Sequence, residues 1–237
     1  MITLEDNYKC VISLGMRCHT EIFLKHLGLK YFSGPFDAMY SKSIVSIIYL
    51  LENKLSYNDL LYTEDLQDEI IKQLNQKHGY RTMHKLMHYN KDNLEYSYHK
   101  ALLPHHNLKN NNVKEHFERC FNRLNKIKYH KIKTLFCLFI HPDYSDDCDV
   151  SIEEINILKN YLHNNFNCKL LVCKFKKTKQ NYEWNILFNE NNLIYIHINN
   201  SSHIFEHIEK VLKEIFKYLN IYNCTLLKYD EIENIKN

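Results

Sequence analysis

Turn-forming residues are scarce in this chain. Its 237 residues include only four glycines and three prolines. Three of those glycines and one proline fall between Gly15 and Pro35. Because glycine adopts left-handed backbone at little cost, a chain with few glycines keeps them where the geometry requires them. The first forty residues therefore carry the strongest structural signal in the sequence.

Other absences exclude whole classes of protein. No apolar run is long enough to cross a bilayer, so we expect no membrane span. Residues 1–7 lack the basic and apolar parts of a signal peptide, which predicts a cytoplasmic protein, in the host cytoplasm if the chain is viral. The net charge of +3 is too small to predict specific nucleic-acid binding. No Cys-x-x-Cys pair occurs among the eight cysteines, and several lie in apolar runs, which predicts buried thiols.

Apolar runs that alternate with amphipathic stretches predict an α/β fold. The order of these elements predicts one domain over residues 1–237, with a mostly parallel, Rossmann-like sheet flanked by helices. A helical insertion over about 54–130 is expected after the second helix, with residues 79–112 irregular. Ligands of parallel sheets bind beyond the carboxyl ends of the strands, and Gly15 and His141 both follow predicted strands.

Cys18 is the leading candidate for a reactive group. The run Val11–Leu14 is typical of a buried strand, which ends at Gly15 and leads directly into a helix. Backbone N–H groups in the first turn of a helix favour a thiolate over a thiol. A nucleophile also needs exposure and a base within reach. The amides of Gly15, Met16 and Arg17 are candidates to bind the substrate and its oxyanion.

A base and an orienting carboxylate have candidates in two other segments. His105 and His106 precede a predicted helix, although with fifteen histidines a surface loop is the simpler interpretation. Asp37 follows Pro35 and Phe36, which are candidates for substrate contact. Asp37 could orient a histidine or the substrate, and a role as helix N-cap is the structural alternative.

Pairs of histidines raise the question of a metal site. His84 and His88, like His203 and His207, would share a face if they were helical. A zinc site needs a third ligand, and the His-Glu-x-x-His pattern is absent. We therefore predict no metal and no other cofactor.

The N-terminal motifs resemble those of a known family. Ile12–Cys18, followed by an amphipathic helix and then Ser33–Asp37, resemble the putative papain-like cysteine peptidase family, whose members occur in bacteria and large DNA viruses. The family pattern usually has tryptophan after Pro-Phe-Asp, where this chain has Ala38. The segments His105–Asn107, Glu118–Arg123 and Leu135–Ile140 resemble its later section.

The resemblance implies a cysteine-dependent hydrolase. Cys18 would be its nucleophile and His105 or His106 its base, with a peptide, isopeptide or other acyl group as substrate.

Two alternatives remain open. One is a protein without catalysis that binds a phosphorylated or sugar-nucleotide ligand at the Gly15 turn. The other is an interaction module, which predicts Cys18 buried far from any histidine. The sequence leaves the oligomeric state, the substrate and the choice of histidine undetermined.

Overall fold

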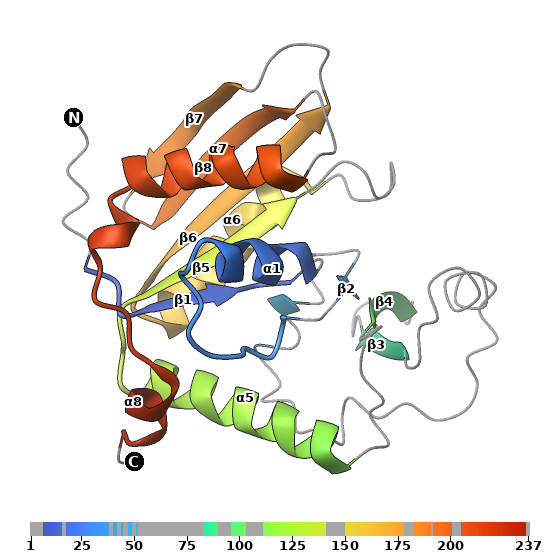
Figure 1. The fold of residues 1–237 in the computed structure, drawn as a ribbon. Coiled ribbons are helices and arrows are strands. Elements are labelled where there is room, and N and C mark those ends of the chain that lie inside the picture. The colour runs from blue at the N-terminus through green and yellow to red at the C-terminus, as the bar shows by residue number, and fades with distance from the viewer. Residues whose placement is uncertain are drawn as a thin grey trace.

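A five-stranded sheet with helices on both faces forms the body of the molecule (Figure 1). The computed structural model describes residues 7–15, 18–37, 40–41, 44, 47–48, 51, 83–89, 96–102, 111–140, 150–177, 183–190, 192–200 and 205–235. None of the helices in these ranges is long and apolar enough to span a membrane.

The main sheet is mostly parallel, as the sequence predicts. Its strand order is β1-β5-β6-β8-β7. The strands are β1 (Cys10–Ser13), β5 (Thr134–Ile140), β6 (Cys168–Lys177), β8 (Leu193–Asn200) and β7 (Glu183–Glu190). The first four run parallel, and β7 pairs antiparallel with β8 at one edge. Every residue of β5 is buried, which fits a continuous apolar run covered on both faces.

Two layers of helices cover the sheet. On one face lie α1 (Cys18–His26) and α7 (Phe205–Tyr218), and the short helix η2 (Ile221–Asn223) follows α7 in the chain. On the other face lie α5 (Asn111–Tyr129), α6 (Ile152–Asn165) and α8 (Tyr229–Glu233). A capping box begins α6, since the Ser151 hydroxyl accepts from the Glu154 N–H at 3.1 Å and the Glu154 carboxylate accepts from the Ser151 N–H at 2.9 Å.

Part of the insertion is β-structure, which corrects the prediction that residues 79–112 are irregular. β3 (Met83–Tyr89) and β4 (Tyr96–Leu102) form an antiparallel hairpin, and β2 (Tyr40–Ser41) joins β4 in a separate three-stranded sheet. The hairpin was missed because its strands are rich in His, Tyr and Lys, which blur the alternation of apolar and polar residues. The sequence also gave no sign of β7, whose side chains are mostly exposed.

Candidate functional site

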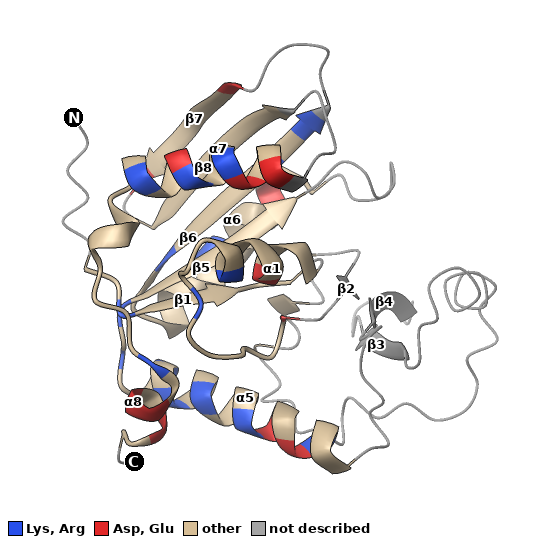
Figure 2. Ribbon diagram, viewed as in Figure 1, with Lys and Arg blue, Asp and Glu red and all other residues tan. Residues whose placement is uncertain are grey.

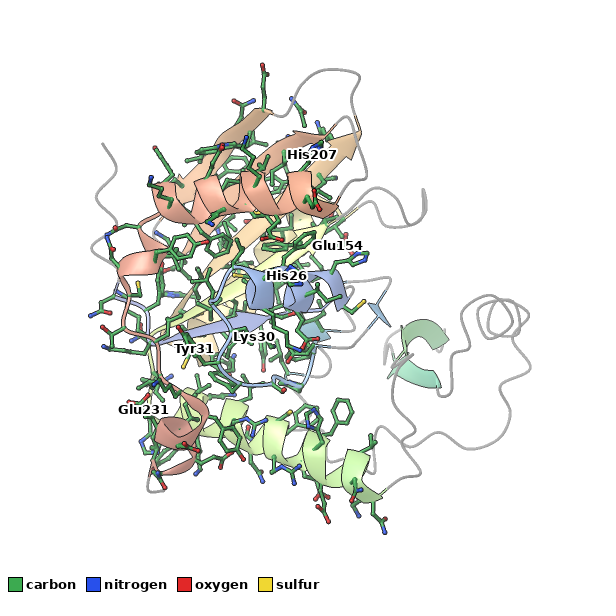
Figure 3. All side chains as sticks on the ribbon, viewed as in Figure 1. His26, Lys30, Tyr31, Glu154, His207 and Glu231 are labelled. Atoms are coloured by element: carbon green, nitrogen blue, oxygen red, sulfur yellow. The ribbon has the colours of Figure 1, made fainter. Side chains whose placement is uncertain are left out.

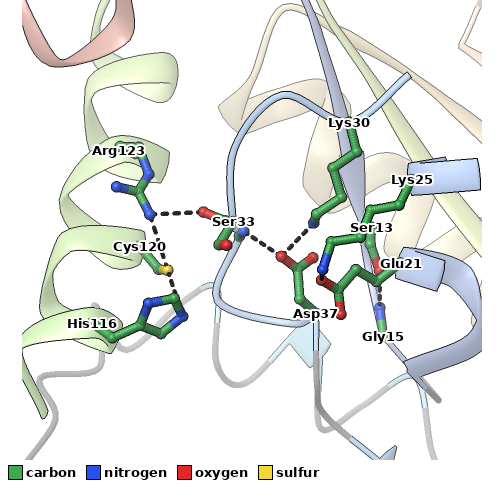
Figure 4. Close-up of polar contacts among 11 residues, drawn as sticks. Ser13, Gly15, Glu21, Lys25, Lys30, Ser33, Asp37, His116, Cys120 and Arg123 are labelled. Atoms are coloured by element: carbon green, nitrogen blue, oxygen red, sulfur yellow. Dashed lines mark hydrogen bonds and ion pairs between the residues drawn. The ribbon is translucent and has the colours of Figure 1, made fainter. Parts of the chain in front are cut away.

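The turn from β1 into α1 has the geometry that its glycine suggests. Gly15 has a φ of 78°, a left-handed conformation that glycine adopts without strain. Its N–H donates to the Ser13 hydroxyl at 3.3 Å (Figure 4). Its carbonyl accepts from the Thr20 hydroxyl at 3.3 Å. These contacts tie the end of the strand to the first turn of the helix. Met16 and Arg17 lie outside the described residues.

Cys18 is the first residue of α1, and its surroundings differ from those of the buried cysteines. It is only partly buried. Cys10, Cys137 and Cys173 are buried in the core, as the sequence predicts, and burial raises the pKa of each. For Cys10 that pKa is about 12. Cys18 is therefore more exposed than those three cysteines, and exposure is one requirement of a nucleophile.

Asp37 lies in a buried loop beside α1. Its carboxylate forms an ion pair with Lys30, and the two side chains are 8% and 3% exposed. Asp37 Oδ2 also accepts a hydrogen bond of 2.6 Å from the Gly34 N–H (Figure 4). Lys30 belongs to the segment that connects α1 to this loop (Figure 3). The other oxygen, Asp37 Oδ1, is buried and has no hydrogen-bond partner among the described residues.

The electrostatics of Asp37 favour its protonated form more than in an ordinary aspartate. Burial raises the pKa of Asp37 to about 6, the Lys30 ammonium opposes that rise, and the charge of Glu21 adds to it. Glu21 also pairs with Lys25, at 2.5 Å. Glu21 is three residues after Cys18 on α1, a spacing that puts both on one side of the helix. The Cys18 side of α1 thus carries a carboxylate whose charge acts on Asp37.

A second polar group, on α5, was missed by the sequence reasoning. Cys120 Sγ lies 3.6 Å from His116 Nε2 and 3.1 Å from an Arg123 terminal nitrogen, which donates to it. Its signal was the His-x-x-x-Cys spacing inside a predicted helix. Burial raises the pKa of Cys120 to about 11 against the lowering effect of Arg123, and the residue is fully buried. Despite its histidine, Cys120 is a poor nucleophile.

The remaining candidates have different outcomes. Pro35 and Phe36 are buried, with Phe36 in the hydrophobic core, and their contact with a substrate stays a prediction. His105 and His106 lie outside the described residues, as does His141. Within the described ranges, no group of three or more potential metal ligands occurs. His84 and His88 lie in β3, so the condition that this pair is helical is not met.

One backbone pairing bears on the histidines that the structure does not describe. Tyr40 of β2 is paired with Leu102 of β4 in antiparallel register. Asp37 comes three residues before Tyr40, and His105 comes three residues after Leu102. Three extended residues span about 10 Å at most. Asp37 and His105 are therefore each separated from the Tyr40–Leu102 pair by only three residues of chain.

Residues 9–176 of the 237 match the model of a protein family described as putative papain-like cysteine peptidase. The matched range contains Cys18, Asp37, the segment with His105 and His106, and α5. It ends before β7, β8, α7 and α8. No curated protein and no solved structure matches the chain.

Proposed function

Since this chain belongs to the putative papain-like cysteine peptidase family, we propose that it is a cysteine-dependent hydrolase with Cys18 as its nucleophile. The observation that carries the proposal is the position of Cys18, partly exposed in the first turn of α1 and directly after the Gly15 turn. N–H groups at a helix start stabilise negative charge on sulfur. The substrate we propose is a peptide, isopeptide or other acyl compound.

The proposed base is a histidine that follows β4. Asp37 and His105 are each three residues along the chain from the Tyr40–Leu102 pair, which supports a histidine of this segment as the partner of Asp37. The buried Asp37 Oδ1 has no partner among the described residues and is suited to accept an imidazole N–H. A carboxylate in that position would hold the ring and stabilise its protonated form.

These groups suffice for a two-step acyl transfer. The histidine takes the proton of Cys18, and the thiolate attacks the substrate carbonyl to form a tetrahedral oxyanion near the Gly15 turn. The oxyanion collapses to a thioester on Cys18 while the imidazolium gives its proton to the leaving amine. Water then adds to the thioester, again with the histidine as base. Collapse of this second intermediate releases the carboxylic acid and restores the thiol.

The test is labelling of the folded protein with a thiol-directed probe, followed by peptide mass spectrometry. We expect one dominant site at Cys18, and we expect Cys18→Ala to abolish that labelling. Cys224→Ala is the matched control, because Cys224 is also a partly buried thiol but lies after η2. Labelling that stays unchanged in Cys18→Ala would refute the proposal.

A further inference from the structure

The guanidinium of Arg123 joins three separate segments of the chain. Its side chain is only 3% exposed. One terminal nitrogen donates to Glu233 at 3.0 Å. The other donates to the Ser33 carbonyl at 2.9 Å and to Cys120 Sγ at 3.1 Å (Figure 4). A buried cation is stabilised by a nearby anion and by hydrogen bonds. Both terminal nitrogens of Arg123 have partners, whereas its buried Nε has none among the described residues. Arg123 receives that anion from Glu233, near the C-terminal end of the described chain.

The helix that carries Glu233 is fixed against α5 by several contacts. Lys126 donates to the Glu233 backbone carbonyl at 2.7 Å, and the Tyr229 ring centre lies 5.1 Å from the Arg123 guanidinium carbon. Ile232, between them, is fully buried in the core. Acidic residues of α8 stand next to the basic end of α5 (Figure 2). α8 lies beyond the range that matches the family, whereas Arg123 lies within it.

Arg123 and Asp37 hold opposite sides of one peptide group. The Ser33 carbonyl, which accepts from Arg123, and the Gly34 N–H, which donates to Asp37 Oδ2, belong to the same peptide bond. A trans peptide is planar, and its C=O and N–H point in opposite directions. A change in the orientation of the Ser33 carbonyl therefore rotates the N–H that holds Asp37. Hydrogen bonds in such a chain also polarise one another.

We propose that Arg123 is a positioning residue for Asp37, and that α8 keeps it in position through Glu233. This inference rests on the proposed function, because Asp37 matters for catalysis only if it orients the base of Cys18. Loss of Glu233 leaves a buried cation without its carboxylate and frees Arg123 to turn away from Ser33. The Ser33–Gly34 peptide then loses one of its two anchors, and the carboxylate of Asp37 loses its fixed orientation.

The test compares Glu233→Ala with Glu231→Ala in the full chain. Glu231 lies on the same helix, but its carboxylate accepts from the Lys228 N–H, at the start of that helix. The first measurement is hydrogen exchange of the Gly34 amide by NMR. We expect exchange at least about 10-fold faster in Glu233→Ala, because local opening becomes easier. We expect a much smaller change in Glu231→Ala, which removes a cap of α8 but leaves the carboxylate that pairs with Arg123. The second is the pH midpoint of Cys18 labelling, which we expect to rise only in Glu233→Ala.

A Gly34 exchange rate that Glu233→Ala leaves unchanged would overturn the proposal, and so would faster exchange with an unmoved pH midpoint. If Glu233→Ala does not fold, the double variant Arg123→Met/Glu233→Met replaces the buried ion pair by apolar groups. It still lacks the bond to Ser33, so the same two changes are expected. If Cys18 of the unsubstituted chain is not labelled at any pH, the proposed function fails, and Gly34 exchange alone decides the role of α8.

Discussion

At the scale of single residues, Asp37 has the most unusual environment in the site. Its carboxyl group is almost fully buried, it pairs with Lys30, and the charge of Glu21 acts on it from α1. Burial raises its pKa more than the lysine lowers it, which leaves a value of about 6. A carboxyl group that titrates near neutral pH can alternate between accepting and donating a hydrogen bond.

The contribution of Glu21 can be measured directly. Because its negative charge raises the pKa of Asp37, Glu21→Gln should lower that pKa below about 6. Lys30→Met should raise it, since the ammonium favours the ionised carboxylate. NMR titration of the Asp37 carboxyl carbon gives both values. An Asp37 pKa that neither substitution changes would contradict the proposed effects of Glu21 and Lys30 on this carboxyl group.

The same shift has a consequence for stability. The pKa of Asp37 is about 6 in the folded chain against an ordinary 3.8, so between these two values the folded state binds more protons than the unfolded state. The free energy of unfolding should therefore fall as the pH rises from about 4 to about 6, by about 3 kcal/mol from this group, and should level off above that range. The difference between the pH–stability curves of the unsubstituted chain and Asp37→Asn isolates the effect. Curves that stay parallel over this range would contradict it.

The sequence predicts those features of the site that neighbouring residues form, and it does not predict contacts between distant segments. The strand, the Gly15 turn and the start of α1 at Cys18 are neighbours in the chain, and these features are confirmed. The Lys30–Asp37 pair and the contacts of Arg123 depend on tertiary packing. No periodicity in the sequence reports such packing, so these contacts required coordinates.

At the scale of elements, the turn between β1 and α1 fixes where Cys18 stands. Gly15 and Gly28 both have left-handed backbone, with φ of 78° and 68°. Alanine at either position should destabilise the fold by about 1–2 kcal/mol, because a Cβ atom is strained in that conformation.

The two glycines should differ in their effect on the thiol. Gly15→Ala disturbs the turn that leads into α1 and should slow labelling of Cys18, whereas Gly28→Ala lies beyond the other end of that helix. Thermal unfolding of both variants measures the backbone strain that alanine introduces. The labelling rates show whether the Gly15 turn affects the reactivity of Cys18. Equal labelling rates in the two variants would show that the Gly15 turn does not govern Cys18.

Helices and strands are predicted best where burial makes the pattern of apolar and polar residues regular. The apolar run of β5 and the amphipathic pattern of α7 are of this regular kind, and element prediction relies on such patterns. It failed for β7 and for the β3–β4 hairpin, where polar and aromatic side chains are mixed. Such strands form because neighbouring strands complete their hydrogen bonds, and that is information a local window does not contain.

At the scale of the whole molecule, two hydrophobic clusters pack against opposite faces of the main sheet. Residues of β5 alternate between them, with Phe136 and Leu138 on one face and Leu135 and Cys137 on the other. Because one sheet separates the clusters, we expect them to unfold together in one cooperative transition, as in a single domain.

A buried and an exposed leucine-sized side chain test this expectation. Leu138→Ala should lower the free energy of unfolding by about 3–5 kcal/mol, because it leaves a cavity in the core. Ile157, which is 56% exposed on α6, should tolerate alanine within about 0.5 kcal/mol. Denaturant titrations followed by tryptophan fluorescence and by circular dichroism should give coincident curves. Two separate transitions would indicate that the described elements do not form one cooperative unit.

The most direct measurement of the central claim is the rate of Cys18 labelling as a function of pH, in the unsubstituted chain and in His105→Ala and His106→Ala. We predict a labelling midpoint well below the ordinary cysteine pKa of about 8.5, and a return toward that value when the histidine that acts as base is removed. A midpoint at or above about 8.5 in all three proteins would contradict it.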